Sequence, residues 1–114
     1  MKVLLDENLD HGLRTLLPPH DVFTTAYMGW AGLKNGELLR EAEESGIEVL
    51  LTGDQTLTYE QNLLGRRLAI VALSAVQLPI IRNNLPAIID AINKAQPGSF
   101  QLVECGVFNR RKPD

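Results

Sequence analysis

Residues 2–8 read KVLLDEN, an apolar run that changes abruptly to acidic and polar side chains at Asp6. A second change of this kind occurs in residues 48–54, EVLLTGD, where the apolar run ends shortly before Asp54. Apolar runs without polar alternation are typical of strands that are covered on both faces, as in parallel sheets. We therefore predict two buried strands, each followed at its carboxyl end by a carboxylate.

Further strands and helices alternate along the chain. Short β-rich or apolar runs between turn signals predict strands at residues 21–25, 68–73 and 100–105. Helical spacing of apolar residues predicts helices at residues 9–17, 35–45, 59–64 and 78–92. Asn8 is expected to cap the first helix, and Pro18-Pro19 to end it. Pro86 is expected either to kink the last helix or to begin a second one capped by Asn84.

This alternation predicts an α/β fold. Right-handed crossovers connect parallel strands, so helices cover both faces of a mainly parallel sheet of about four to five strands. In such sheets, ligands bind beyond the carboxyl ends of the strands. Asp6 and Asp54 are predicted to lie at that edge.

The composition is that of one globular domain. With 114 residues, 45% apolar and 22% charged, we expect a domain over residues 1–108 and a solvated tail at 109–114. The net charge of −3 excludes a globally basic protein, although it leaves room for a local basic rim. The longest apolar run, at 68–73, is far shorter than the roughly 20 residues that cross a bilayer.

The cysteine content indicates the compartment. Cys105 is the single cysteine, which excludes an intramolecular disulfide and a cysteine-based zinc site. A reducing environment fits this composition. We therefore expect a soluble, cytoplasmic protein with no membrane segment.

Three carboxylates are expected to converge at the functional edge. Glu37 stands in the first turn of the helix that precedes the second acid-bearing strand, and joins Asp6 and Asp54 there. Carboxylates held close together repel one another unless they share a cation. Oxygen ligands select Mg²⁺ or Mn²⁺, whose chemistry includes phosphodiester hydrolysis by an activated water. Each acid also suits an ordinary role, because Asp6 and Glu37 fit helix N-termini and Asp54 fits a turn.

Three segments together resemble one known family. They are residues 3–9 (VLLDENL), 29–38 (GWAGLKNGEL) and 49–54 (VLLTGD), followed by 61–63 (QNL). Over about residues 1–75, their order and spacing are similar to the bacterial PIN-like family typified by the DUF5615 domain. The resemblance implies an α/β sandwich and a metal-dependent ribonuclease, with Asp6, Glu37 and Asp54 as the catalytic and metal-binding acids. It also implies a small antitoxin partner, as in VapBC-type toxin–antitoxin pairs.

The chain departs from the family at one position. Thr56 stands where PIN nucleases often carry a fourth acid, so a second metal ion would be held weakly. Glu7 is the nearest substitute, although alternation along the chain directs it away from Asp6. A PIN-like module that binds without catalysis is therefore one alternative.

A receiver-like phosphoacceptor domain is the second alternative. Asp54 would then be phosphorylated, while Asp6 and Glu7 would hold Mg²⁺. The sequence argues against it, because no Lys ends the last predicted strand and Asp54 is followed by no Met-Pro-type turn.

Other residues are assigned supporting roles. Asn8 is expected to hold Asp6, and Thr52 to hydrogen-bond an Asp carboxylate or a metal-bound water. Four residues are predicted to contact RNA, three through phosphates and one by base stacking: Lys34, Arg66, Arg67 and Trp30. Plain capping, packing or solvation is the alternative for each.

Three further residues and one surface complete the expectations. His11 and His20 are expected at the surface or in caps, and Cys105 in a buried edge strand. The apolar helices after Ser74 offer a surface for a homodimer.

Overall fold

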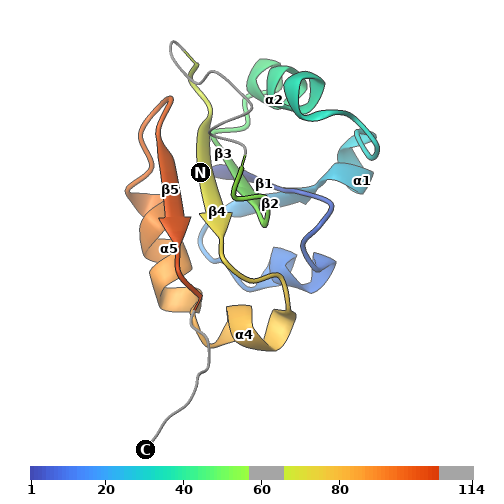
Figure 1. The fold of residues 1–114 in the computed structure, drawn as a ribbon. Helices are drawn as coiled ribbons and strands as arrows, with labels where there is room; N and C mark the ends of the chain where they lie inside the picture. The colour runs from blue at the N-terminus through green and yellow to red at the C-terminus, as the bar shows by residue number, and fades with distance from the viewer. Residues whose placement is uncertain (57–65, 106–114) are drawn as a thin grey trace, which may run out of the picture.

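The computed structural model describes residues 1–56 and 66–105 (Figure 1). Within these residues one sheet has the strand order β2-β1-β3-β4-β5, and every neighbouring pair is parallel. The strands are β1 (Lys2–Leu5), β2 (Asp21–Thr24), β3 (Val49–Thr52), β4 (Ala69–Leu73) and β5 (Phe100–Val103). The predicted α/β class and parallel sheet are therefore confirmed.

Helices fill the described connections between the strands. They are the 3-10 helix η1 (His11–Thr15), α1 (Thr25–Met28), α2 (Asn35–Glu44), α4 (Leu78–Arg82) and α5 (Leu85–Asn93). α2 and α5 lie on opposite sides of the sheet (Figure 1). The result is a three-layer sandwich with the sheet in the middle.

The core forms because side chains alternate between the two faces of buried strands. Val3 and Leu5 of β1 join residues of η1, α4 and α5 in one apolar cluster, whereas Leu4 joins residues of α2 in another. Every residue of β3 and β4 is buried. Full burial of one such side chain contributes about 1.5–3 kcal/mol relative to exposure. The unbroken apolar runs of the sequence thus provide side chains that pack against helices on both faces of the sheet.

The order in which strands are added to the sheet changes direction between β1 and β3, although all strands stay parallel. β2 is added on one side of β1, and β3, β4 and β5 follow on the other side. In open parallel sheets ligands bind beyond the carboxyl ends of the strands at this reversal point. Asp6 directly follows β1 and Asp54 closely follows β3, so both acids lie at the reversal point.

The first predicted helix is wrong in its length and in its cap. The segment forms only the 3-10 helix η1, whose N-cap is Asp10, with its side chain accepting the Gly12 N–H at 2.7 Å. Asn8 is engaged elsewhere, because its Oδ1 accepts the N–H of Gly53 at 3.1 Å. A contact between distant segments has replaced the local cap that the sequence pattern indicated.

The second strand ends one residue earlier than predicted. Thr24 caps the short helix α1, with its Oγ1 accepting the Tyr27 N–H at 3.0 Å. Gly29 ends that helix in a left-handed conformation, with a φ of +78°. This conformation carries a steric penalty for a residue with a Cβ atom, which explains the glycine.

The helical region after β4 divides in two, which is one of the alternatives predicted for Pro86. α4 ends at Arg82 and α5 begins at Leu85, with Pro86 in the first turn, where a backbone N–H has no intrahelical acceptor. Asn84 occupies the cap position, but its Nδ2 donates to the carbonyl oxygens of Ile80 (2.8 Å) and Cys105 (3.1 Å).

Of the remaining predicted segments, some are present in the structure and others lie outside the described residues. The helix predicted at 35–45 is present as α2. The edge strand predicted at 100–105 is present as β5 but ends at Val103, so Cys105 is buried beyond the strand and not in it as predicted. The predictions for residues 59–64 and for the tail at 109–114 lie outside the described residues.

Candidate functional site

Asp6 is fixed at the end of β1 by backbone and side-chain hydrogen bonds. Its N–H donates to the carbonyl oxygen of Leu51 at 2.9 Å, which continues the pairing of β1 with β3. Its side chain accepts two hydrogen bonds: Oδ1 from the Glu7 N–H at 2.8 Å, and Oδ2 from the Thr52 hydroxyl at 2.7 Å. The residue is only 8% exposed. The carboxylate is therefore held in one orientation at the edge of the sheet.

Thr52 joins the two acidic loops. It is completely buried at the end of β3, and its Oγ1 donates to Asp6 while accepting the Asp54 N–H at 2.9 Å. The hydrogen bond predicted between Thr52 and an Asp carboxylate is therefore present. This hydroxyl fixes the position of Asp54 relative to Asp6.

Asp54 is oriented by a residue that the sequence analysis considered only as a missing acid. Its Oδ1 accepts the Thr56 N–H at 2.9 Å and the Thr56 hydroxyl at 2.7 Å. This is the side-chain turn that Asp forms with the backbone two residues on. An Asp followed two residues later by Thr is a signal that identifies Thr56 from sequence as the orienting residue.

Asn8 supports the loop after β3 and not Asp6, so its predicted role is wrong. Its Oδ1 accepts the Gly53 N–H. Gly53 is required by a close approach, because a Cβ atom there would lie 2.4 Å from Cγ1 of Val76. Asn8 and Val76 together hold Gly53 in place, and so the turn that leads to Asp54.

Glu37 does not complete a three-carboxylate group in this structure. It is exposed in the first turn of α2, a helix that crosses back over the sheet before β3. Among residues 1–56 and 66–105, no three His, Cys, Asp or Glu side chains are arranged to hold a metal ion. Glu7 is engaged in the loop before α2, where its Oε1 accepts the Gly32 N–H at 2.9 Å.

The donor chemistry of Asp6 and Asp54 suits a hard divalent cation. A carboxylate has about four lone-pair sites, so each oxygen of Asp6 keeps acceptor capacity beside the one hydrogen bond described. Mg²⁺ usually keeps several waters and is held by one or two carboxylates together with substrate phosphates. Asp6 and Asp54 are two such carboxylates at one edge of the sheet, whereas the exposed side chain of Glu37 is not grouped with them.

Two of the predicted RNA-contacting residues, Trp30 and Lys34, flank Gly32, whose N–H donates to Glu7. Lys34 is exposed just before α2. Trp30 is half-buried and packs against the core cluster of α2. Its backbone N–H donates to the carbonyl oxygen of Thr25 at 2.8 Å. The packing alternative therefore accounts for Trp30.

The predicted position of Arg66 and Arg67 near the acids is wrong. They immediately precede β4, and the start of β4 at Ala69 is level with Val49, at the start of β3. In a parallel sheet this is the amino edge, opposite Asp6 and Asp54.

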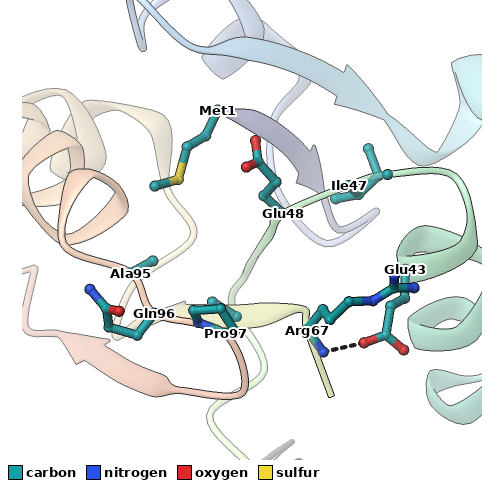
Figure 2. Close-up of a pocket in the computed structure, with 10 residues that line it drawn as sticks. Met1, Glu43, Ile47, Glu48, Arg67, Ala95, Gln96 and Pro97 are labelled. Atoms are coloured by element: carbon teal, nitrogen blue, oxygen red, sulfur yellow. Dashed lines mark hydrogen bonds between the residues drawn. The ribbon is translucent and has the colours of Figure 1, made fainter. Parts of the chain in front are cut away.

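At the amino edge both arginines contact Glu43 of α2, and Figure 2 shows the contact that Arg67 makes. Arg66 forms an ion pair with Glu43 at 3.3 Å, and the N–H groups of Arg67 and Leu68 donate to its carboxylate. Burial by itself raises the pKa of Glu43, but these N–H donors and the charges of Arg66 and Arg67 outweigh it and lower that pKa below its ordinary value. A hollow of about 360 Å³ beside Arg67 is lined by Glu48 and Gln96, among others. These contacts give the arginines a structural role.

Cys105 is a buried residue, whereas His11 is exposed and His20 is partly buried. Cys105 is fully buried, its N–H donates to the Ser74 hydroxyl at 2.7 Å, and burial raises the pKa of its thiol. His11 is exposed, as predicted, and His20 lies with Nδ1 3.1 Å from the Met1 nitrogen.

Comparison with other proteins gives no match: no family model, curated protein or solved structure is similar to this chain. In the described residues no helix is long and apolar enough to cross a bilayer. The functional argument therefore depends on the residues of the chain itself.

Proposed function

We propose that the protein is a Mg²⁺- or Mn²⁺-dependent ribonuclease that hydrolyses phosphodiester bonds at the carboxyl edge between β1 and β3. One observation carries the proposal. Asp6 and Asp54 follow neighbouring parallel strands at the reversal point of the sheet, and the buried hydroxyl of Thr52 joins them. The resemblance of the three sequence segments to the PIN-like family supports the same activity.

Each residue has a distinct task in this proposal. Asp6, held by two hydrogen bonds, and Asp54, oriented by Thr56, provide oxygen ligands. Glu37 provides a third oxygen when its exposed side chain turns towards them. When bound, the metal ion lowers the pKa of a coordinated water and stabilises negative charge on the phosphate.

The biological setting proposed follows from the same resemblance. RNA is the substrate, the cytoplasm is the compartment, and a small antitoxin protein is the partner that covers the acidic edge. A homodimer through the helices after Ser74 would use their outer faces, because Ile81, Ile88 and Ile92 of α4 and α5 are buried in the core of this chain.

A PIN-like module that binds without cleaving is the alternative that a specific observation favours. The described residues contain no assembled group of three metal-binding side chains. The receiver-like alternative is suggested by the strand order of this sheet, which is also that of known phosphoacceptor domains. However, β5 is followed by Glu104, where that chemistry needs a lysine.

The test is cleavage of a mixed RNA pool with Mg²⁺, with Mn²⁺ and with EDTA. Wild type is expected to cleave only with metal, and Asp6→Asn and Asp54→Asn to lose at least about 100-fold of the rate, as expected when a principal charge-stabilising interaction is removed. Asp21→Asn is the matched control, because Asp21 is exposed at the amino end of β2. All three variants are checked for folding by their melting temperatures.

Two results would reject the ribonuclease assignment. One is RNA cleavage that persists in both Asp6→Asn and Asp54→Asn, which identifies a contaminating nuclease. The other is an inactive wild type that is stabilised by metal only when Asp6 and Asp54 are intact, which supports the binding module.

A further inference from the structure

A second feature of the molecule is a groove of about 660 Å³ beside β2. It is bounded by η1 with His11, Gly12 and Arg14, by residues 22–24 of β2, and by Tyr27 of α1. Among the strands that the structure describes, β2 pairs with β1 alone and so forms one edge of the sheet. The volume is in the range of pockets that hold small ligands or single residues of a polymer.

Arg14 is the charged residue that lines the groove, together with the imidazole of His11, and none of the described lining residues is acidic. The neighbouring Asp10 carboxylate is engaged as the N-cap of η1, where it accepts the Gly12 N–H at 2.7 Å. His11 and Arg14 are both exposed, and neither side chain has a hydrogen bond or ion pair within residues 1–56 and 66–105. For a chain with 14 acidic and 11 basic residues, this local arrangement favours an anionic ligand.

The aromatic residues of the groove form a stacking surface. Tyr27 is 77% exposed, although large aromatic rings are usually buried. Its ring stacks with that of Phe23, at 6.1 Å between centroids and 27° between planes. The hydrogen bond from the Tyr27 N–H to Thr24 fixes the start of α1. An exposed ring supported by a second ring can stack with any nucleobase, because every base has an aromatic face.

The groove extends to the carboxyl end of β2, which pairs with the strand that precedes Asp6. Thr24, which lines the groove at the end of β2, is the register partner of Leu5, and Asp6 follows Leu5. A chain lying in the groove would therefore pass directly to the carboxyl ends of β1 and β3.

We propose that this groove binds one nucleotide of single-stranded RNA beside the bond that is cleaved. The base stacks on Tyr27, and a backbone phosphate faces Arg14 and His11. The identity of the ligand as RNA depends on the proposed function, whereas the geometry of the groove does not.

The test is the affinity of a fluorescein-labelled, mixed-sequence RNA 12-mer, measured by anisotropy in EDTA so that no cleavage occurs. Arg14→Ala and Tyr27→Ala are each expected to raise Kd about tenfold. Tyr27→Phe keeps the stacking ring and is expected to stay within about twofold of wild type. Arg40→Ala, at an exposed position of α2, is the charge-matched control and is also expected to stay within about twofold.

The outcomes separate this inference from the proposed function. If Arg14→Ala and Tyr27→Ala weaken RNA binding but wild type cleaves no RNA with metal, the groove is supported and the ribonuclease proposal fails. If wild type cleaves and both variants bind RNA as wild type does, the groove assignment is overturned. Equal weakening by Arg40→Ala, or no RNA binding by wild type, also overturns it, and leaves the open edge of β2 as a docking edge for a protein strand.

Discussion

The Thr52 hydroxyl has two partners, and each belongs to a different acid. It donates to the Asp6 carboxylate and accepts the Asp54 N–H, at a position with no solvent exposure. The sequence indicated a role for Thr52 because the apolar run of β3 ends there. It did not reveal the role of Asn8, because the partner of Asn8 is Gly53, 45 residues along the chain.

Replacement of Thr52 by valine tests this link, because valine keeps the shape and removes the hydroxyl. We expect the free energy of unfolding to fall by about 1–3 kcal/mol, since the partly buried Asp54 N–H loses its acceptor and the Asp6 carboxylate loses a donor. We also expect Mn²⁺ affinity to fall about 10–100-fold, as when a residue that orients a metal ligand is removed. Urea unfolding and Mn²⁺ titration measure the two effects. Thr52→Ser is the control, and unchanged Mn²⁺ affinity in Thr52→Val would deny the hydroxyl a positioning role.

Gly53 provides a steric test of the same loop. A Cβ atom at this position would lie 2.4 Å from Cγ1 of Val76, and the β-branched valine side chain has little freedom to move. Gly53→Ala is expected to lower the free energy of unfolding by about 1–3 kcal/mol. Gly53→Ala should cost less free energy of unfolding when it is introduced into Val76→Ala than when it is introduced into wild type. Thermal and urea unfolding compare the variants, and the absence of any recovery would show that Val76 is not the obstacle.

At the scale of elements, the predictable features were those set by periodicity. The apolar runs identified β1, β3 and β4, and the helical spacing of apolar residues identified α2. The first helix could not be predicted correctly, because Asn8 is used by a loop 45 residues further along the chain. The position of Arg66 and Arg67 follows from strand direction alone: residues before a parallel strand lie at its amino end.

Glu43 connects α2 to the start of β4, and its charge makes that connection depend on pH. Because its pKa is lower in the folded protein, the stabilisation is present above the unfolded-state pKa, ordinarily 4.5, and is lost as the pH falls through the folded-state value. Glu43→Gln is therefore expected to be less stable than wild type at pH 7, by about 1–2 kcal/mol. The difference should shrink at pH 3, which urea unfolding at the two pH values measures. An equal difference at both pH values would contradict this assignment of the charge.

At the scale of the whole molecule, the two edges of the sheet have different characters. The carboxyl edge carries Asp6 and Asp54, and the amino edge carries the Glu43 cluster with its arginines. The fold class followed from the order of strands and helices, because short connections leave few other topologies. The convergence of Glu37 with the other acids did not follow, because a position in the first turn of a helix does not fix where an exposed side chain points.

The overall charge leads to a prediction for the salt dependence of RNA binding. The chain has a net charge of −3, and only Arg14 and His11 line the proposed groove as basic residues. Each phosphate contact on a single strand contributes a slope of about 0.7 in log Kd against log salt. We therefore expect a shallow slope of about 0.7–1.4, measured by anisotropy over a series of salt concentrations. A slope near 3 or above would indicate a far more extended basic surface.

The most direct test of the account is Mn²⁺ binding followed by electron paramagnetic resonance, in which the signal of free Mn²⁺ decreases as the ion binds. The account predicts saturable binding by wild type that Mg²⁺ competes away. It predicts that binding is lost in Asp6→Asn and in Asp54→Asn and kept in Asp21→Asn. No saturable binding by wild type, or equal binding by all four proteins, would contradict the assignment of the carboxyl edge as a metal site.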